Sequence, residues 1–128
     1  MTNVFIVDDS TDMRKGLAIQ FPQTQGLNIV GEAGDTHRAI GGILRCKPDI
    51  VVLDISLPGG NGFEVLSRIK KEGPSTVVIM LTNHDLSQYR KHALENGADH
   101  FFDKVTEFES FLDAVHCFAA DALREPSI

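Results

Sequence analysis

Five polar side chains of this sequence could act together, because each lies at or just beyond the end of a short apolar run. They are three carboxylates, one hydroxyl and one ammonium group: Asp8, Asp9, Asp54, Thr82 and Lys104. Neighbouring carboxylates repel one another unless a cation or a proton lies between them. Oxygen ligands also suit Mg²⁺ far better than zinc. If the fold brings these residues together, we expect them to bind a hydrated Mg²⁺.

Asp54 is the candidate for covalent chemistry. It ends the most apolar run of the chain, residues 50–53, and precedes the segment LPGGNG at 57–62, whose glycines permit a tight backbone path around a ligand. A carboxylate can accept a phosphoryl group when cations neutralise the transferring oxygens, and the metal and Lys104 could do this here. We therefore predict that Asp54 is an in-line nucleophile.

Each of these residues also has a plain structural interpretation when it is taken alone. An acidic pair such as Asp8-Asp9 is favoured at a helix N-terminus by the helix dipole. Asp54 and Thr82 could be loop, strand or cap residues, and a lysine such as Lys104 often points into water. Only the combination of all five predicts a site.

Short apolar runs alternate with amphipathic stretches along the chain. Five runs are too short for helices and predict strands: 4–7, 27–30, 50–53, 77–81 and 101–102. Four of them are rich in Val and Ile without polar alternation, which is typical of parallel strands covered on both faces. Helices are expected between them, beginning at or near capping residues: Ser10, Asp35, Asn61 with Glu64, Asp85, and Thr106 with Glu109.

This alternation predicts the fold. Five strand-then-helix repeats with short connections imply right-handed crossovers and a parallel sheet with helices on both faces. We expect an α/β, flavodoxin-like (βα)5 doubly wound parallel sheet with strand order 2-1-3-4-5, in one domain over residues 1–123 followed by a short C-terminal tail at 124–128. Ligands of such sheets lie outside the carboxyl ends of the strands, so the five polar residues should converge there.

Composition excludes several classes of function. The 128 residues carry a formal net charge of −6, which opposes nucleic-acid binding, and contain no apolar run near the ~20 residues of a membrane span. The N-terminus shows no secretory signal, so we expect a cytoplasmic protein. The two cysteines, Cys46 and Cys117, are too few for a disulfide framework and are predicted to be reduced packing residues.

Several motifs together resemble a response-regulator receiver domain over roughly the whole chain. They are Val7-Asp8-Asp9, Val52-Leu53-Asp54 with Leu57-Pro58 and Gly62, Leu81-Thr82, Gly97-Ala98, and Phe101-Phe102-Asp103-Lys104. The resemblance implies a signalling phosphoacceptor of a two-component system or phosphorelay, and no enzyme beyond its own phosphorylation and dephosphorylation.

The resemblance also implies roles for individual residues. Asp54 would be phosphorylated from the phosphohistidine of a histidine kinase or phosphotransfer protein, or slowly by small phosphodonors. The Mg²⁺ shell would comprise Asp9, Asp54 and the backbone carbonyl of Ser56, with Asp8 contributing through water. Thr82 and Lys104 would bond the phosphoryl oxygens.

By the same resemblance, Phe101 is the aromatic member of a switch coupled to Thr82. Phosphorylation would draw Thr82 inward and let the ring turn into the vacated space, shifting a pre-existing equilibrium. The bland alternative, a core aromatic on the last strand, stays open. The output surface would be the fourth helix, fifth strand and fifth helix, Asp85 to Ala122, binding a downstream protein or a second copy in a phosphorylation-dependent homodimer.

Three positions depart from the family pattern or vary within it. Val105 stands where the family often has a proline preceded by a cis bond, which leaves the geometry of the Lys104-Val105 bond open. Ser56 and His84 lie two residues beyond Asp54 and Thr82, where they would flank the path of an attacking water. We hypothesise that His84 influences the lifetime of the phosphorylated state; a surface histidine at a helix start is the alternative.

Three rival interpretations follow from the same residues. A haloacid-dehalogenase-type phosphohydrolase also phosphorylates an aspartate after a strand, but expects a second aspartate where Ser56 stands. A degenerate receiver would act as a binding module without phosphorylation, although it typically lacks some of the acidic residues present here. A receiver excised from a longer regulator is the third, while the absence of an output domain favours a stand-alone receiver.

Overall fold

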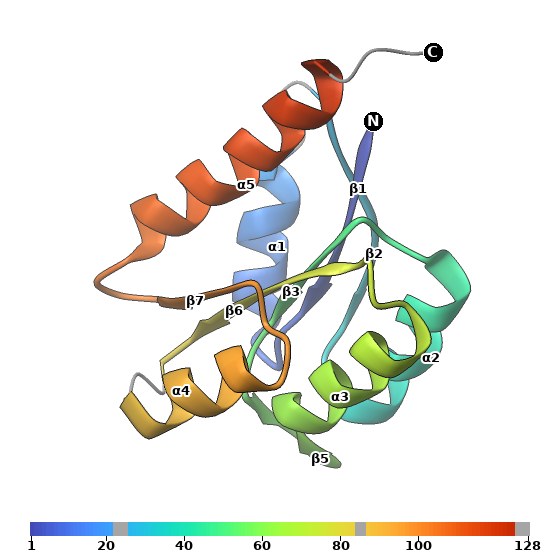
Figure 1. Ribbon diagram of the computed structural model, residues 1–128, viewed down its shortest axis with the longest axis vertical. Coiled ribbons are helices and arrows are strands. Elements are labelled where there is room, and N and C mark those ends of the chain that lie inside the picture. The colour runs from blue at the N-terminus through green and yellow to red at the C-terminus, as the bar shows by residue number, and fades with distance from the viewer. Residues whose placement is uncertain (22–25, 84–86, 125–128) are drawn as a thin grey trace.

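The computed structural model describes residues 1–21, 26–83 and 87–124. One sheet of five parallel strands runs through it in the order β2-β1-β3-β6-β7 (Figure 1). Counted along the chain, these strands have the predicted order 2-1-3-4-5, so the flavodoxin-like fold is confirmed. Their bounds are β1 Thr2–Val7, β2 Leu27–Ala33, β3 Ile50–Leu53, β6 Val77–Thr82 and β7 His100–Asp103.

Five helices in the described part of the chain cover the two faces of this sheet. They are α1 Thr11–Gln20, α2 Thr36–Cys46, α3 Gly62–Glu72, α4 Ser87–Glu95 and α5 Phe108–Arg124. Buried residues of α1 and α5 join one core cluster, and those of α2, α3 and α4 join the other, so the sheet separates two apolar layers. No helix among residues 1–21, 26–83 and 87–124 is long and apolar enough to cross a membrane.

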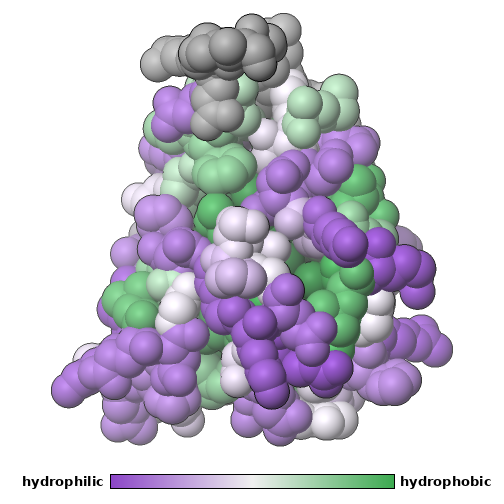
Figure 2. All heavy atoms as spheres, turned by 45° about the vertical axis from the view of Figure 1, so that its right-hand side comes forward, coloured by the Kyte–Doolittle hydropathy of each residue, from purple (hydrophilic) through white to green (hydrophobic). Residues whose placement is uncertain are grey.

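The strands are apolar without interruption because both faces are covered. In β3, Val51 and Leu53 point into one cluster, while Ile50 and Val52 point into the other. All four side chains are at most 2% exposed. On the face that Figure 2 shows, hydrophilic side chains separate the apolar ones, as expected when the large apolar residues fill the two layers.

Three predicted helix starts are confirmed by their capping bonds. The side chains of Ser10, Asp35 and Asn61 each accept a hydrogen bond from the backbone N–H three residues later. The predicted α4 start at Asp85 lies outside the described residues. Gly97, which follows α4, has φ +101°, a left-handed conformation that glycine adopts without strain and that agrees with the predicted helix end.

Two local predictions are wrong. α5 begins at Phe108, and the Glu107 carbonyl accepts its first helical bond from the Phe111 N–H, so Thr106 is not the N-cap. The Asp103 carboxylate instead accepts from the N–H groups of residues 105 and 106 and holds them in a preceding turn. Cys117 is exposed, so it is not a packing residue, whereas Cys46 is partly buried against the core.

The structure also bears on the Lys104-Val105 bond, whose geometry the sequence left open, and on the end of the last helix. The described peptide bonds include no cis bond, so Lys104-Val105 is trans. α5 extends to Arg124, the first residue of the predicted tail, and residues 125–128 lie outside the described part of the chain.

Adjacent glycines in α2 are expected to respond oppositely to alanine. Among the described residues, nothing lies within 4 Å of a Cβ built at Gly41, so Gly41→Ala should raise the free energy of unfolding by about 1 kcal/mol through helix propensity. A Cβ at Gly42 would lie 2.6 Å from the buried Phe5 ring, so Gly42→Ala should lower it by about 1–3 kcal/mol. Urea unfolding of both variants tests this, and shifts of the same sign would contradict the packing argument.

Candidate metal centre and reactive carboxylate

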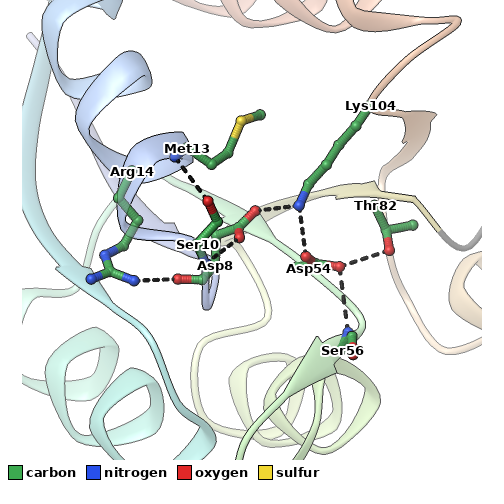
Figure 3. Close-up of polar contacts among 8 residues, drawn as sticks. All are labelled: Asp8, Ser10, Met13, Arg14, Asp54, Ser56, Thr82 and Lys104. Carbon is green, nitrogen blue, oxygen red and sulfur yellow. Dashed lines mark hydrogen bonds and ion pairs between the residues drawn. The ribbon is translucent and has the colours of Figure 1, made fainter.

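The fold brings the five predicted residues together at the carboxyl edge of the sheet. Asp8 follows β1, Asp54 follows β3, Thr82 ends β6 and Lys104 follows β7, and these four strands are neighbours. Figure 3 shows the side chains of these four residues pointing toward one another. Asp8, Asp54 and Thr82 are at most 5% exposed, so the site is recessed, whereas Asp9 faces solvent.

Three carboxylates form an oxygen-only cluster. Asp8, Asp9 and Asp54 each offer one oxygen, and these oxygens lie within 4.8 Å of one another. Two of the side chains are buried and one is exposed, so a cation here could keep part of its hydration. Mg²⁺ prefers oxygen ligands and retains several waters, so this donor set fits it.

Lys104 is inserted between two of these carboxylates. Its Nζ lies 2.6 Å from Asp8 Oδ2 and 2.8 Å from Asp54 Oδ2, and its side chain is 13% exposed. Burial by itself would lower the pKa of Lys104, but the hydrogen bonds and charges of Asp54 and Asp8 outweigh it and raise that pKa. The ammonium group therefore stays charged and partly neutralises the pocket.

Thr82 contacts the other oxygen of Asp54. Its Oγ1 donates a hydrogen bond of 2.7 Å to Asp54 Oδ1, and the Ser56 N–H reaches the same oxygen at 3.4 Å. Both carboxylate oxygens of Asp54 thus have donors around them. A carboxylate held in this way has a hydroxyl and a cation close to where the oxygens of an incoming anionic group would lie.

The loop after Asp54 is more ordered than its glycines suggest. Strands β4 Ser56–Leu57 and β5 Gly60–Asn61 form a small antiparallel pair that the sequence did not indicate. The first residue of α3, Gly62, packs on the backbone of Asp54, where a Cβ would collide with the Asp54 carbonyl. This close approach explains the glycine and fixes the segment that carries Ser56.

A second group of contacts surrounds Phe101, whose ring is 4% exposed. The Arg90 guanidinium lies 4.8 Å from the centre of this ring, donates to the Phe101 carbonyl and pairs with Glu107 at 2.6 Å. The hydrogen bond from Arg90 holds the pKa of Glu107 below its usual value. Neither Arg90 nor Glu107 was predicted, and His84 lies outside the described residues.

Asp8→Asn is expected to stabilise the metal-free protein. Burial raises the pKa of Asp8, and its bonds to Lys104 and the Ser10 N–H offset this only in part. Protonated Asp8 therefore stabilises the folded protein, and this contribution is fully present below pH 3.8 and lost as the pH rises through the raised pKa. At neutral pH, where Asp8 is ionised, its buried charge lowers the free energy of unfolding. A neutral amide should add about 0.5–2 kcal/mol, the usual range for stabilising substitutions.

Urea unfolding at pH 7 with a chelator, and again with Mg²⁺, measures this effect. Mg²⁺ should stabilise the wild type more than Asp8→Asn, because binding to the folded state adds stability. A lower unfolding free energy for Asp8→Asn in chelator would contradict the prediction.

The fold and the pocket define a doubly wound α/β protein with an acidic, lysine-containing site at the carboxyl edge of its sheet. Residues 4–116 match the family described as the response regulator receiver domain, and the chain belongs to this family. It is accordingly a signalling domain of two-component systems. Receiver domains bind Mg²⁺ at an acidic pocket, and the carboxylates of Asp8, Asp9 and Asp54 form a cluster that could hold it.

Similar proteins agree with this assignment. The nitrate/nitrite response regulator protein NarP of Escherichia coli is 32% identical over 116 residues, which are 91% of this chain and 54% of NarP. The response regulator domain of Thermotoga maritima CheB is 28% identical with a TM-score of 0.82, covering 99% of both chains. A chain of the CheX–CheY–BeF3–Mg²⁺ complex of Borrelia burgdorferi is 33% identical with a TM-score of 0.82, covering 91% of this chain and 88% of that one.

The curated relatives are longer than this chain. The chain spans 48% of the length of DevR/DosR of Mycobacterium tuberculosis and 60% of VraR of Staphylococcus epidermidis. A stand-alone receiver is therefore still only a prediction from the sequence.

Proposed function

We propose that Asp54 is the phosphoacceptor of this receiver, taking a phosphoryl group from the phosphohistidine of a histidine kinase or a histidine phosphotransfer protein. The observation that carries the proposal is the setting of Asp54, a buried carboxylate with Lys104 Nζ at one oxygen and Thr82 Oγ1 at the other. A loop or cap aspartate has no need of a buried lysine and a buried hydroxyl.

The transfer exchanges one bond for another. A carboxylate oxygen of Asp54 attacks phosphorus, the P–N bond of the donor breaks, and the imidazole leaves with the bonding electron pair and takes up a proton. Lys104 and Thr82 then bond the phosphoryl oxygens, at positions close to the Asp54 oxygens that they contact now. Hydrolysis of the acyl phosphate by water returns the carboxylate and phosphate, so the domain acts on itself and not on a separate substrate.

The metal ligands belong to the same proposal. Asp9, Asp54 and the Ser56 backbone carbonyl would bind Mg²⁺ directly, and Asp8 would contribute through water. The ion would neutralise charge on the transferring group. The 4.8 Å carboxylate cluster and the hydrogen bond between Ser56 N–H and Asp54 support this set.

Phosphorylation would be read out through Thr82 and Phe101. They lie on the adjacent strands β6 and β7, in which Met80 pairs with Phe101. Thr82 contacts Asp54 and the Phe101 ring is buried, an arrangement that supports this readout. A phosphoryl group that holds Thr82 would favour this arrangement and alter the surface from 85 to 122, whose first residues lie outside the described part.

The partners follow from this function. Besides the phosphodonor, a downstream protein or a second phosphorylated copy would bind the α4–β7–α5 surface. A net charge of −6 argues against direct nucleic-acid binding by this domain. We place the domain in the cytoplasm, where ATP-dependent kinases produce phosphohistidine.

The test is the intact mass of the protein after incubation with acetyl phosphate and Mg²⁺, beside a chelator control. One phosphoryl adduct is expected with Mg²⁺ and none with the chelator. A folded protein that gains no adduct from several small donors and a phosphorylated histidine kinase would instead favour the phosphorylation-independent binding module.

A further inference from the structure

Arg14, in the first turn of α1, reaches back to the loop that carries the acidic pair. Its Nη1 donates a 2.6 Å hydrogen bond to the Asp8 backbone carbonyl, as Figure 3 shows. Its Nε pairs with Glu32 Oε1 of β2 at 3.0 Å, and its side chain is only 16% exposed. One guanidinium thus connects α1, the loop after β1 and the edge strand of the sheet.

The structure keeps a space for this guanidinium. A Cβ built at Gly34 would lie 2.8 Å from Arg14 Nη1 and 3.7 Å from the Asp8 carbonyl oxygen. Gly34 is not among the residues with positive φ, so its backbone conformation does not require glycine. The missing side chain is explained by the room that Arg14 needs beside Asp8.

The bond to the Asp8 carbonyl has a specific consequence for Asp9. The peptide group is planar, so fixing the carbonyl oxygen of Asp8 fixes the plane that also contains the nitrogen of Asp9. The flanking residues are held as well, because the Asp8 N–H donates to the Ala33 carbonyl and the Ser10 N–H donates to Asp8 Oδ1. Asp9 is exposed, and its direction therefore depends on its anchored neighbours.

We propose that Arg14 is a positioning residue of the metal site, which aims the Asp9 carboxylate by holding the Asp8-Asp9 peptide. This inference rests on the proposed function, in which Asp9 binds Mg²⁺. Three neighbouring carboxylates repel one another, so the metal-free loop would otherwise open. Outer-shell partners of metal ligands commonly change affinity 10- to 100-fold, and we expect about this effect here.

The positive charge of Arg14 weakens Mg²⁺ binding, whereas its positioning role strengthens it. The test must therefore keep this charge constant. A cation near the pocket disfavours Mg²⁺, although Glu32 neutralises much of this charge. Gly34→Ala displaces the guanidinium without changing any charge. Arg14→Lys keeps the charge but cannot donate to Asp8 and Glu32 with the same planar fork.

The experiment is calorimetric titration of Mg²⁺ into the unphosphorylated full chain. Gly34→Ala and Arg14→Lys should each raise the Kd for Mg²⁺ by about 10- to 100-fold. Gly16→Ala, in α1, is the matched control, because nothing described lies within 4 Å of its added Cβ, and it should bind as the wild type does. Uptake of phosphoryl groups from acetyl phosphate should be slow at limiting Mg²⁺ and recover at saturating Mg²⁺.

Urea unfolding shows whether each variant is folded. If Arg14→Lys does not fold, Gly34→Ala alone decides the outcome. Wild-type Mg²⁺ affinity in folded Gly34→Ala would overturn the inference and leave the proposed function intact. A Kd for Mg²⁺ that Asp9→Asn leaves unchanged would overturn the positioning role and Asp9 as a ligand, whereas Asp54 as the phosphoacceptor is tested separately by the intact mass. Failure of saturating Mg²⁺ to restore phosphoryl uptake would also overturn the positioning role, since it would indicate damage beyond the metal site.

Discussion

Asp54→Asn is expected to take up no phosphoryl group under conditions in which the wild type takes up one. The amide has nearly the same shape, and its Oδ1 can still accept the hydrogen bond from Thr82. It lacks the anionic oxygen that would attack phosphorus, however, and its NH₂ group would face Lys104 Nζ, so that two donors meet. The fold should survive while the chemistry is lost.

The matched control is Asp49→Asn. Asp49 immediately precedes β3 whereas Asp54 immediately follows it, so the same substitution is made at the two ends of one strand. Asp49 is exposed and its carboxylate accepts from the Asn3 N–H, far from the pocket. Intact mass after acetyl phosphate treatment should show the adduct on Asp49→Asn. An adduct of equal yield on Asp54→Asn would mean that another residue is the acceptor.

The site could be predicted from the sequence because the fold places it by a simple rule. The strand β3, for example, is recognisable from four consecutive apolar residues, and Asp54 is the first polar residue after it. In a parallel sheet every strand presents its carboxyl end at the same edge, so residues far apart in sequence must meet there. Asp8, Thr82 and Lys104 follow from the same argument.

The supporting contacts could not be predicted in this way. Arg14 and Arg90 are long side chains whose partners include Glu32 and Glu107, on other elements of the fold. No periodicity or spacing specifies such a pair, since many exposed carboxylates lie within reach of a flexible arginine. In hindsight, the only local signal for the position of Arg14 was Gly34, and a glycine after a strand has many explanations.

The prediction that Thr106 caps α5 was wrong for a related reason. Thr106 and Glu109 have the spacing of a capping box, but the Asp103 carboxylate accepts from the Thr106 N–H, the donor that Glu109 would have to bond. A local motif predicts a helix start only when no nearby acceptor offers the backbone another partner. Here the acceptor belongs to β7, and the sequence alone does not show which carboxylate wins.

Lys104→Met is expected to tighten Mg²⁺ binding and to slow phosphoryl uptake. The ammonium group contacts Asp8 and Asp54 at 2.6 and 2.8 Å, where it would compete with Mg²⁺ for the same carboxylates. Its removal should tighten Mg²⁺ binding by about tenfold or more, since a unit charge some 4 Å away contributes roughly 1–4 kcal/mol in a partly screened site. A role limited to holding the fold together would not tighten metal binding.

Phosphoryl uptake by Lys104→Met should nevertheless fall by about 10²–10³-fold, the usual effect of removing one preorganised donor from a transition state. Methionine keeps most of the length of the side chain but offers no charge to the phosphoryl oxygens. Lys70→Met is the matched control, because Lys70 is similarly buried and pairs with Asp99 in an unrelated network. Calorimetry gives the Mg²⁺ affinity and timed intact-mass measurements give the rate. If Lys70→Met slowed uptake equally, lost stability would explain both variants. Because the Lys70 network lies apart from the pocket, we expect only Lys104→Met to combine tighter Mg²⁺ binding with slower transfer.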